Sequence, residues 1–169
     1  MSDPRGTGTG PGPVARRFTR EELLSYEGAL VDDLIDARTR LLFVGINPGL
    51  WTAAVNAHFA RGGNRFWPAL HRAGILPRLI DARAGMSADD AELVLAHGIG
   101  ITNIVPRASA RADELSRAEL VAGGARLIEL VRATRPRVVA ILGLTAYRHA
   151  FARRDATAGA QDELSLIHI

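Results

Sequence analysis

The sequence predicts an α/β fold in which helices cover both faces of a parallel sheet. Three short apolar runs have the composition of buried strands, and segments with helical spacing alternate with them along the chain. The 169 residues are enough for one domain, and 47% of them are hydrophobic, so the chain can bury a core.

The N-terminal part is expected to begin with a tail and a short helix. Residues 1–17 form the predicted disordered tail, since residues 1–13 are rich in Gly and Pro and carry no apolar periodicity. Thr19 and Glu22 have the spacing of a capping box, which predicts a helix over 20–26.

The middle of the chain predicts two strands with helices between them. Leu41–Ile46 is too apolar to alternate between faces, which indicates a strand buried on both sides. Helices are predicted over 64–73 and 88–96, and Pro68 is compatible with the first only if it lies in the first turn. Ile99–Val105 is the second predicted strand.

The C-terminal part repeats this alternation. Ser116 and Glu119 form a second capping box, and the apolar residues after it recur at helical spacing. Arg137–Gly143 is the third predicted strand. Thr145 is predicted to cap a final helix over 145–152.

Composition excludes several kinds of site. The chain has no cysteine, which rules out disulfides, thiolate zinc sites and iron–sulfur clusters and fits a reducing cytoplasm. No uncharged apolar stretch has the length of a membrane span, so no membrane partner is expected. There is no phosphate loop or nucleophile elbow, and the five histidines lack metal-ligand spacing, so we expect no cofactor and no metal.

The basic residues are all arginines, 21 in number, and the sequence pI is about 10.4. Arginine binds phosphate groups through two hydrogen bonds, so this composition fits a polyanionic partner such as nucleic acid. A GC-rich genome that favours arginine codons explains it equally well, and composition does not separate the two.

The segment Gly45–Gly49 reads Gly-Ile-Asn-Pro-Gly and directly follows the first predicted strand. Ligands bind at the carboxyl ends of strands in open α/β sheets, so Asn47 stands at the expected edge. We expect a rigid turn, in which Pro48 fixes φ and Gly49 adopts unusual backbone angles. The alternative is an ordinary turn asparagine, because Asn, Pro and Gly all favour turns.

Neutral side chains stand near the predicted strand ends, namely Asn47, Asn64, Asn103 and Phe59. An amide binds a ligand through hydrogen bonds and can orient a water molecule, but it does not titrate and cannot deprotonate that water. Such a site suits a reaction with a good leaving group. Cleavage of an N-glycosidic bond fits, since a pyrimidine departs as a stabilised anion and fixed N–H dipoles stabilise its charge.

Several segments together resemble the mismatch-specific uracil/thymine-DNA glycosylases. Gly45–Leu50 is similar to the first motif of that family, and His58–Trp67 is similar to the family segment that ends Gly-Asn-[Arg/His]-Phe-Trp. Further similarities lie in Gly98–Val105, Glu114–Ser116, Gly123–Leu127, Arg135–Arg137 and Ile141–Gly143. The resemblance runs from about residue 17 to residue 151. It implies a three-layer α/β/α sandwich around a short parallel sheet.

The resemblance also implies an activity. It implies a base-flipping enzyme that acts as a monomer, without a cofactor, on double-stranded DNA with a G·U or G·T mismatch. Asn47 would be the catalytic residue that positions the attacking water. The base pocket would contain Gly45, Ile46, Phe59, Asn64, Asn103 and Ser109. Of these, Phe59 would stack on the flipped base.

For four of these residues a plain structural alternative stays open. For Phe59 it is packing in the core, as expected of a lone aromatic residue. Asn64 would support the wall of the pocket, and the alternative is a helix cap. Arg65 and Arg107 are the candidate phosphate ligands, and the alternative is a solvated surface.

One motif of the family is missing. Its second motif, an Asn-Pro-Ser-Gly-type loop after a fourth strand, supplies the wedge that fills the space left by the flipped base, and no such segment follows Phe151. We therefore expect residues 18–163 to form an incomplete glycosylase domain with one sheet edge uncovered, and this polypeptide to be inactive. Residues 164–169 match a translated sequencing adapter, and the alternative is a genuine final strand.

Mismatch-specific glycosylase activity has alternatives both within and outside the class of uracil-DNA glycosylases. Among uracil-DNA glycosylases, the iron–sulfur type is excluded because the chain has no cysteine, and the single-strand-selective type has Met at the position of Ile46. Outside that class, the alternative is a non-catalytic module that binds nucleotides or DNA on the same fold.

Overall fold

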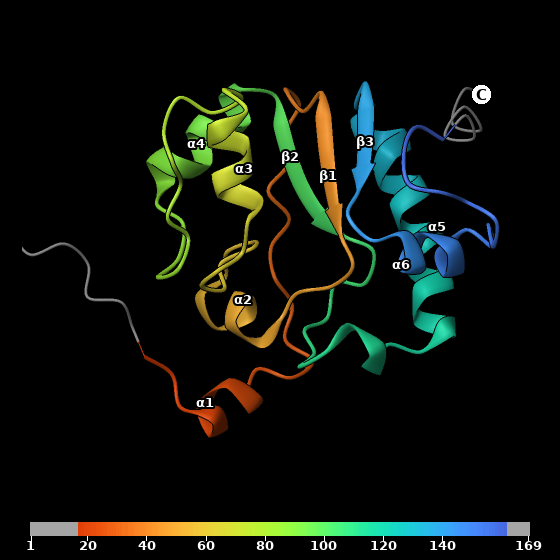
Figure 1. Cartoon of the computed structure of the whole chain (residues 1–169), viewed down its shortest axis with the longest axis horizontal. Helices are drawn as coiled ribbons and strands as arrows, with labels where there is room; N and C mark the ends of the chain where they lie inside the picture. The colour runs from red at the N-terminus through yellow and green to blue at the C-terminus, as the bar shows by residue number, and fades with distance from the viewer. Residues whose placement is uncertain (1–16, 162–169) are drawn as a thin grey trace, which may run out of the picture.

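A sheet of three parallel strands forms the centre of the molecule (Figure 1). The computed structural model describes residues 17–161. The strands are β1 (Leu41–Gly45), β2 (Ile99–Asn103) and β3 (Val138–Ile141), in the order β2-β1-β3. Leu41 pairs with Ile99 on one side and with Val138 on the other, and both pairings are parallel. The predicted parallel sheet is confirmed, with shorter strands than expected.

Helices connect these strands. They are α1 (Arg20–Leu24), α2 (Leu50–Val55), α3 (Phe66–Arg72), α4 (Ala88–Ala96), α5 (Arg117–Thr134) and α6 (Leu144–Ala150), with a short 3-10 helix over Ala112–Glu114. Both predicted capping boxes are present, and they begin α1 and α5. Pro68 is the third residue of α3 and lies in its first turn, where proline is tolerated. Helix α4 has the predicted bounds.

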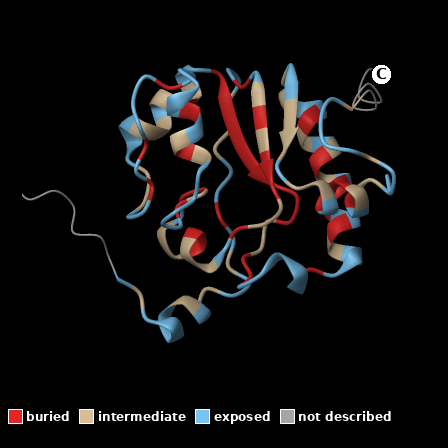
Figure 2. Cartoon of the chain, viewed as in Figure 1, coloured by how far each residue is buried: buried red, intermediate tan, exposed pale blue. Residues whose placement is uncertain are grey.

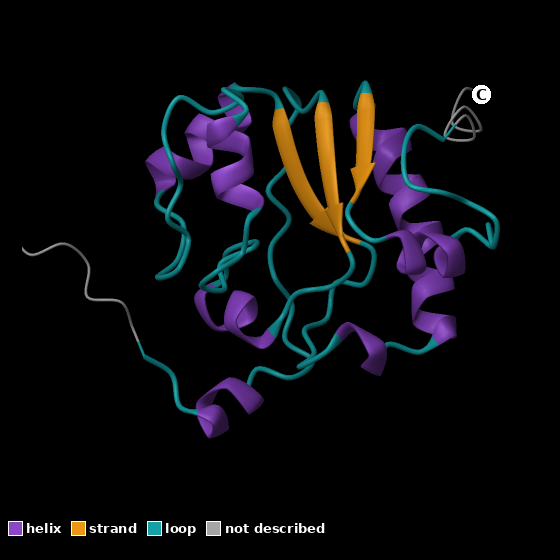
Figure 3. Ribbon diagram, in the orientation of Figure 1, coloured by secondary structure: helices purple, strands orange, loops and turns teal. Residues whose placement is uncertain are grey.

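Helices α3 and α4 lie on one side of the sheet and α5 and α6 on the other, whereas α1 and α2 lie beyond the carboxyl ends of the strands (Figure 1 and Figure 3). Side chains of β1 alternate between the two sides. Leu42 and Val44 are fully buried in a cluster with Leu127 of α5, whereas Phe43 packs on a second cluster with Trp67 of α3. Buried residues accordingly gather on β2, on part of β1 and on parts of the helices, whereas β3 has none (Figure 2). The predicted α/β/α sandwich is confirmed.

Two adjacent glycines let α5 approach its neighbours closely. A Cβ atom on Gly123 would lie closer than 3.0 Å to the carbonyl oxygen of Ile104, and one on Gly124 would lie 2.7 Å from that of Ala150. Real Cβ atoms essentially never make contacts this short, so the packing requires glycine at both positions. Glycine costs a helix about 1 kcal/mol relative to alanine, and this close packing offsets that cost.

Two predicted turn details are wrong. Gly49 has φ −78° and ψ 163°, an ordinary extended conformation, and it caps α2, a helix that the sequence did not predict. The turn after β1 therefore does not use the conformational freedom of glycine. Thr145 is not a helix cap, because the chain turns into α6 directly after β3, with Gly143 at the N-cap and Leu144 as the first helical residue.

Within residues 17–161 the sheet has two edge strands, β2 and β3, and β3 is the more exposed of them. It pairs with β1 alone, and Val138 is 55% exposed. A groove of about 1310 Å³ runs along it, lined by β3, the end of α5, the start of α6 and residues 157–161. The predicted tail up to residue 16 and the adapter-like segment 164–169 lie outside the described residues.

Candidate active site

Two loops run side by side at the carboxyl edge of the sheet, where β1 and β2 end. Gly45 pairs with Asn103 at the end of the parallel ladder. Beyond the strands, the N–H of Ser109 donates to the carbonyl oxygen of Pro48 (3.1 Å), and an isolated bridge joins Ser109 to Gly49. The loop after β2 therefore holds the turn after β1, and it brings predicted site residues from both segments together.

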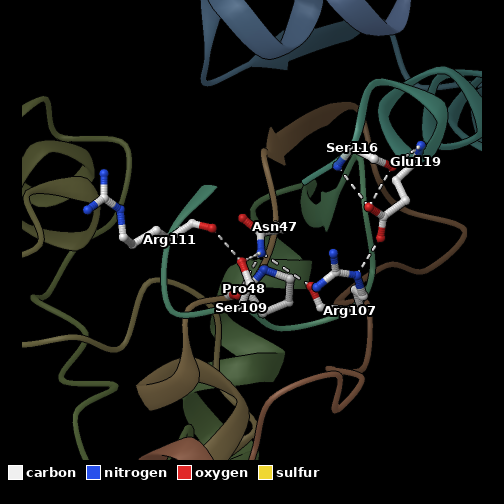
Figure 4. Close-up of polar contacts among 7 residues, drawn as sticks. All are labelled: Asn47, Pro48, Arg107, Ser109, Arg111, Ser116 and Glu119. Atoms are coloured by element: carbon white, nitrogen blue, oxygen red, sulfur yellow. Dashed lines mark hydrogen bonds and ion pairs between the residues drawn. The ribbon is translucent and has the colours of Figure 1, made fainter. Parts of the chain in front are cut away.

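The amide of Asn47 is held through its nitrogen (Figure 4). Atom Nδ2 lies 3.1 Å from the carbonyl oxygen of Pro48, 3.3 Å from that of Arg107 and 2.8 Å from Oγ of Ser109. Because backbone carbonyls only accept hydrogen bonds, the nitrogen and not the oxygen must face them. The oxygen Oδ1 points away from these groups and has no hydrogen-bond partner among the described residues.

Ser109 completes this arrangement. Its hydroxyl donates its one proton to the carbonyl oxygen of Arg111 (2.7 Å), so Oγ offers Asn47 only a lone pair. Ser109 is 1% exposed, so bulk water does not compete for these bonds. Asn47 is thus fixed with its nitrogen bound and its oxygen available to a ligand or a water molecule.

Arg107, a predicted phosphate ligand, is paired with a carboxylate (Figure 4). Its Nε contacts Oε1 of Glu119, and Oε2 of Glu119 accepts from the N–H and the hydroxyl of Ser116, both at 2.8 Å. These hydrogen bonds, that of Arg107 first, lower the pKa of Glu119 to about 2. The pair ties the loop that holds Asn47 to the first turn of α5, and it compensates the charge of Arg107.

Phe59 and Asn103 meet beside Gly45. A Cβ atom on Gly45 would lie closer than 3.0 Å to Oδ1 of Asn103 and 3.6 Å from Cζ of Phe59, so glycine makes room for both side chains. Phe59 has a φ of 55°, which is unusual for an aromatic residue, and its ring stacks on Phe66 with centroids 4.0 Å apart. Backbone strain of this kind clusters at functional sites.

His58 lies beside Phe59 and Asn103, although the sequence analysis left it out of the site. It is 4% exposed, and its Nε2 lies 2.9 Å from the carbonyl oxygen of Asp32, which places the proton on Nε2. Burial lowers the pKa of His58, so the ring is neutral and its Nδ1 can accept from Nδ2 of Asn103 at 3.5 Å. Oδ1 of Asn103 is then the atom that lies toward Gly45. The one signal in the sequence was its place directly before Phe59.

The backbone of Asn103 is held from α5 by Arg126. Atom Nη2 of Arg126 donates to the carbonyl oxygen of Asn103 and, at 3.3 Å, to Oγ1 of Thr102. Atom Nη1 lies 3.5 Å from Oδ2 of Asp33. Helix α5 therefore supports both parts of the site, the Asn47 loop through Glu119 and the end of β2 at Asn103 through Arg126.

The other predicted residues lie apart from this cluster. Ile46 packs its side chain on the α5–α6 face of the sheet, so that side chain does not join the pocket beside Phe59. Asn64 is exposed, and its Oδ1 accepts from the N–H of Phe66 at 2.8 Å. It is not the predicted N-cap, because Arg65 holds that position in α3 and Asn64 lies one residue before it. Arg65 is exposed and forms no ion pair within the described part of the chain.

Residues 17–161 contain no group of three or more His, Cys, Asp or Glu side chains that could hold a metal ion. None of their helices is both long and apolar enough to pass through a membrane.

An α/β/α sandwich with neutral amides at the carboxyl edge of its sheet defines a site built for hydrogen bonding to a ligand. The family model of the Uracil DNA glycosylase superfamily matches residues 33–168, a span that contains every predicted site residue. The chain belongs to this superfamily. Its class is therefore that of the DNA glycosylases, hydrolases that cleave N-glycosyl bonds of DNA in base excision repair.

Proposed function

We propose that this protein is a monofunctional, mismatch-specific glycosylase that excises uracil or thymine paired with guanine in double-stranded DNA. The observation that carries the proposal is Asn47, whose amide nitrogen has three acceptors while its oxygen has no protein partner among the described residues. A neutral acceptor in a fixed position orients a water molecule without removing its proton. That is sufficient where the leaving group departs readily.

The proposed reaction begins when the target nucleotide leaves the stack, because the glycosidic bond is inaccessible inside the duplex. Phe59 stacks on the flipped base. Oδ1 of Asn103 accepts a hydrogen bond from the base, such as that of the N3–H group of uracil or thymine. Neutral His58 fixes this orientation of the Asn103 amide, because its Nδ1 accepts a hydrogen bond from the amide nitrogen and leaves Oδ1 to the base.

The glycosidic bond then breaks, and both of its electrons leave with the pyrimidine. The sugar becomes oxocarbenium-like at C1′, where the oxygen of the water held by Asn47 forms the new bond and its proton passes to solvent. Fixed N–H dipoles stabilise the departing anion. Because the water is already positioned, no bimolecular encounter is needed. In well-oriented intramolecular reactions this lowers the activation free energy by up to roughly 7–11 kcal/mol.

Mismatch preference follows in part from the cost of extrusion. A pyrimidine mispaired with guanine loses less pairing energy than a correctly paired one, by up to a few kcal/mol. Selection therefore begins before the base reaches the pocket beside Phe59.

The test compares Asn47→Ala with Gln161→Ala in a chain to which an Asn-Pro-Ser-Gly-type second motif has been added, because the chain without that motif is expected to be inactive. Gln161→Ala is the control, since the amide of Gln161 contacts nearby backbone carbonyls. We expect single-turnover cleavage of a G·U duplex to fall at least about 100-fold, while affinity for a non-cleavable 2′-fluorinated G·U duplex changes less than about threefold. Parallel losses of binding and cleavage would mean that Asn47 binds DNA instead. Binding without turnover in the chain that has the added motif and neither substitution would favour a non-catalytic module.

A further inference from the structure

We propose that a basic pocket between the start of α5 and the end of α6 binds a phosphate of the DNA backbone beside the target nucleotide. The basic pocket has a volume of about 320 Å³ and is lined by Arg117, Thr145, Arg148, His149, Ala152 and Arg154. The choice of DNA as the source of the phosphate rests on the proposed function. The anionic character of the ligand rests on the lining of the pocket.

The lining is cationic without compensation. Three guanidinium groups, an imidazole and a hydroxyl surround the basic pocket, and no carboxylate lines it. Arg148 is held in place by a neutral group, since its Nε and Nη2 donate to the carbonyl oxygen of Ala156 at 2.9 and 2.6 Å. Like charges around one concave site repel one another, and an anion between them removes that cost.

Seven other arginines of the described chain are paired, whereas some exposed ones, such as Arg61 and Arg65, are not; the basic pocket differs from these in that three unpaired guanidinium groups line one concave site. Arg38, Arg78, Arg83, Arg107, Arg111, Arg126 and Arg132 each pair with a carboxylate. No ion pair within residues 17–161 joins Arg117, Arg148 or Arg154 to an acidic group. Arg107, the phosphate ligand that the sequence predicts, has its charge compensated by Glu119. The arginines of the basic pocket have no such compensation and are better placed to bind a phosphate.

The basic pocket shares its framework with the candidate active site. Arg117 directly follows Ser116, which holds the carboxylate of Glu119, and Glu119 pairs with Arg107, whose carbonyl oxygen bonds to Asn47 (Figure 4). Helix α6 begins directly after β3, at the same carboxyl edge of the sheet (Figure 1). A duplex carries one charge per about 1.7 Å of its axis, so DNA bound at this edge presents many phosphates to its surroundings.

The ligand class follows from the donors. Guanidinium groups offer paired N–H donors that match the oxygens of a phosphate, and the hydroxyl of Thr145 supplies another donor. A backbone phosphate carries no sequence information, so the basic pocket is expected to raise affinity for all duplexes and to fix the register of the protein on DNA.

The experiment measures affinity for a 2′-fluorinated G·U duplex as a function of salt, for the unmodified chain and for Arg117→Gln/Arg154→Gln. We expect the slope of log affinity against log salt to shrink by about 0.9 for each phosphate contact removed, so by about 1–2 in the double variant. The double variant should lose the same affinity for a matched G·C duplex as for the G·U duplex. The control is Arg78→Gln/Arg83→Gln, whose arginines pair with Asp90 and Asp81, and its slope should not change.

An unchanged slope in the Arg117→Gln/Arg154→Gln variant would overturn the proposal. A second result would also overturn it. Inorganic phosphate would stabilise the unmodified chain against heat but not the double variant, while the double variant kept its affinity for DNA. The basic pocket would then bind free anions and not the DNA backbone. The slope does not depend on catalysis. A chain with the added second motif that binds DNA through the basic pocket but never cleaves G·U would therefore disprove the proposed activity and leave this inference standing.

Discussion

Asn47 donates through Nδ2 to Oγ of Ser109 at 2.8 Å, and Ser109 donates its only proton onward to the carbonyl oxygen of Arg111. The direction of this chain of hydrogen bonds decides which atom of Asn47 faces a substrate. A flipped amide would place its oxygen against the carbonyl oxygens of Pro48 and Arg107, with no proton between them.

Ser109→Ala should lower catalysis more than binding. Removal of the hydroxyl takes away the shortest of the three contacts to Asn47, and a hydrogen bond of this kind is worth about 0.5–1.5 kcal/mol. In the chain with the added second motif, we expect kcat to fall by up to about tenfold with KM little changed. Ser109→Thr keeps the hydroxyl and should restore most of kcat. Equal changes in kcat and KM for both variants would contradict a positioning role.

Glu119→Gln should remove a stability contribution that depends on pH. The pKa of Glu119 is about 2 in the folded chain against an ordinary value of 4.5, so the unfolded chain takes up a proton first as the pH falls. The contribution is therefore complete above pH 4.5 and is lost between 4.5 and 2. Urea unfolding at several pH values should show the variant losing less stability than the unmodified chain over this range.

The matched control for that experiment is Glu129→Gln. Glu129 is an exposed residue of the same helix and pairs only with Arg132, three residues away. Its variant should follow the pH dependence of the unmodified chain. If Glu129→Gln and Glu119→Gln behaved alike, the link between α5 and the loop of Asn47 would carry no special stability.

His58→Gln should flatten the stability curve near neutral pH. Burial, the largest cause, lowers the pKa of His58 below its ordinary value of 6.5, although Asp32 and Asp33 act in the opposite direction. The unfolded chain therefore binds a proton before the folded chain does, and the unmodified protein loses stability as the pH falls through about 6.5. The difference in unfolding free energy between pH 8 and pH 5.5 should be smaller in the variant. A larger difference would contradict a buried neutral ring.

Gly123→Ala should destabilise the fold despite the better helix propensity of alanine. The added Cβ would press on the carbonyl oxygen of Ile104, and overpacking of this kind costs about 1–3 kcal/mol. Gly62→Ala is the control, because a Cβ there meets nothing within 4 Å. Thermal unfolding should show a lowered Tm for the first variant alone.

Features that depend on neighbouring residues could be predicted from the sequence. The capping boxes of α1 and α5 and the bounds of α4 are set within one helical turn, and all three are confirmed. The strands were found from their apolar composition. Helix α2 was missed because it has six residues and no side-chain cap, so neither length nor a capping residue marks it.

Contacts between distant residues account for what sequence analysis missed at the site. Arg107 has the composition of a phosphate ligand, but its pairing with Glu119 depends on how the loop meets α5. His58 lies 26 residues from Asp32, whose carbonyl oxygen sets the tautomer of the ring. Ile46 lies within the motif, yet the alternation along β1 sends its side chain to the other face. None of these placements is encoded in local spacing.

Two of the three acceptors around Asn47 are main-chain carbonyls, and these exist whatever side chains occupy positions 48 and 107. Substitution in the loop can therefore alter its surface without changing which way the amide points. Tolerance to mutation should be high at loop positions without such side-chain contacts, and low at Arg107, which pairs with Glu119, and at Ser109, the one acceptor of Asn47 that belongs to a side chain. Variants of this scaffold with new base preferences are best sought by changing the loop while positions 107 and 109 are left alone.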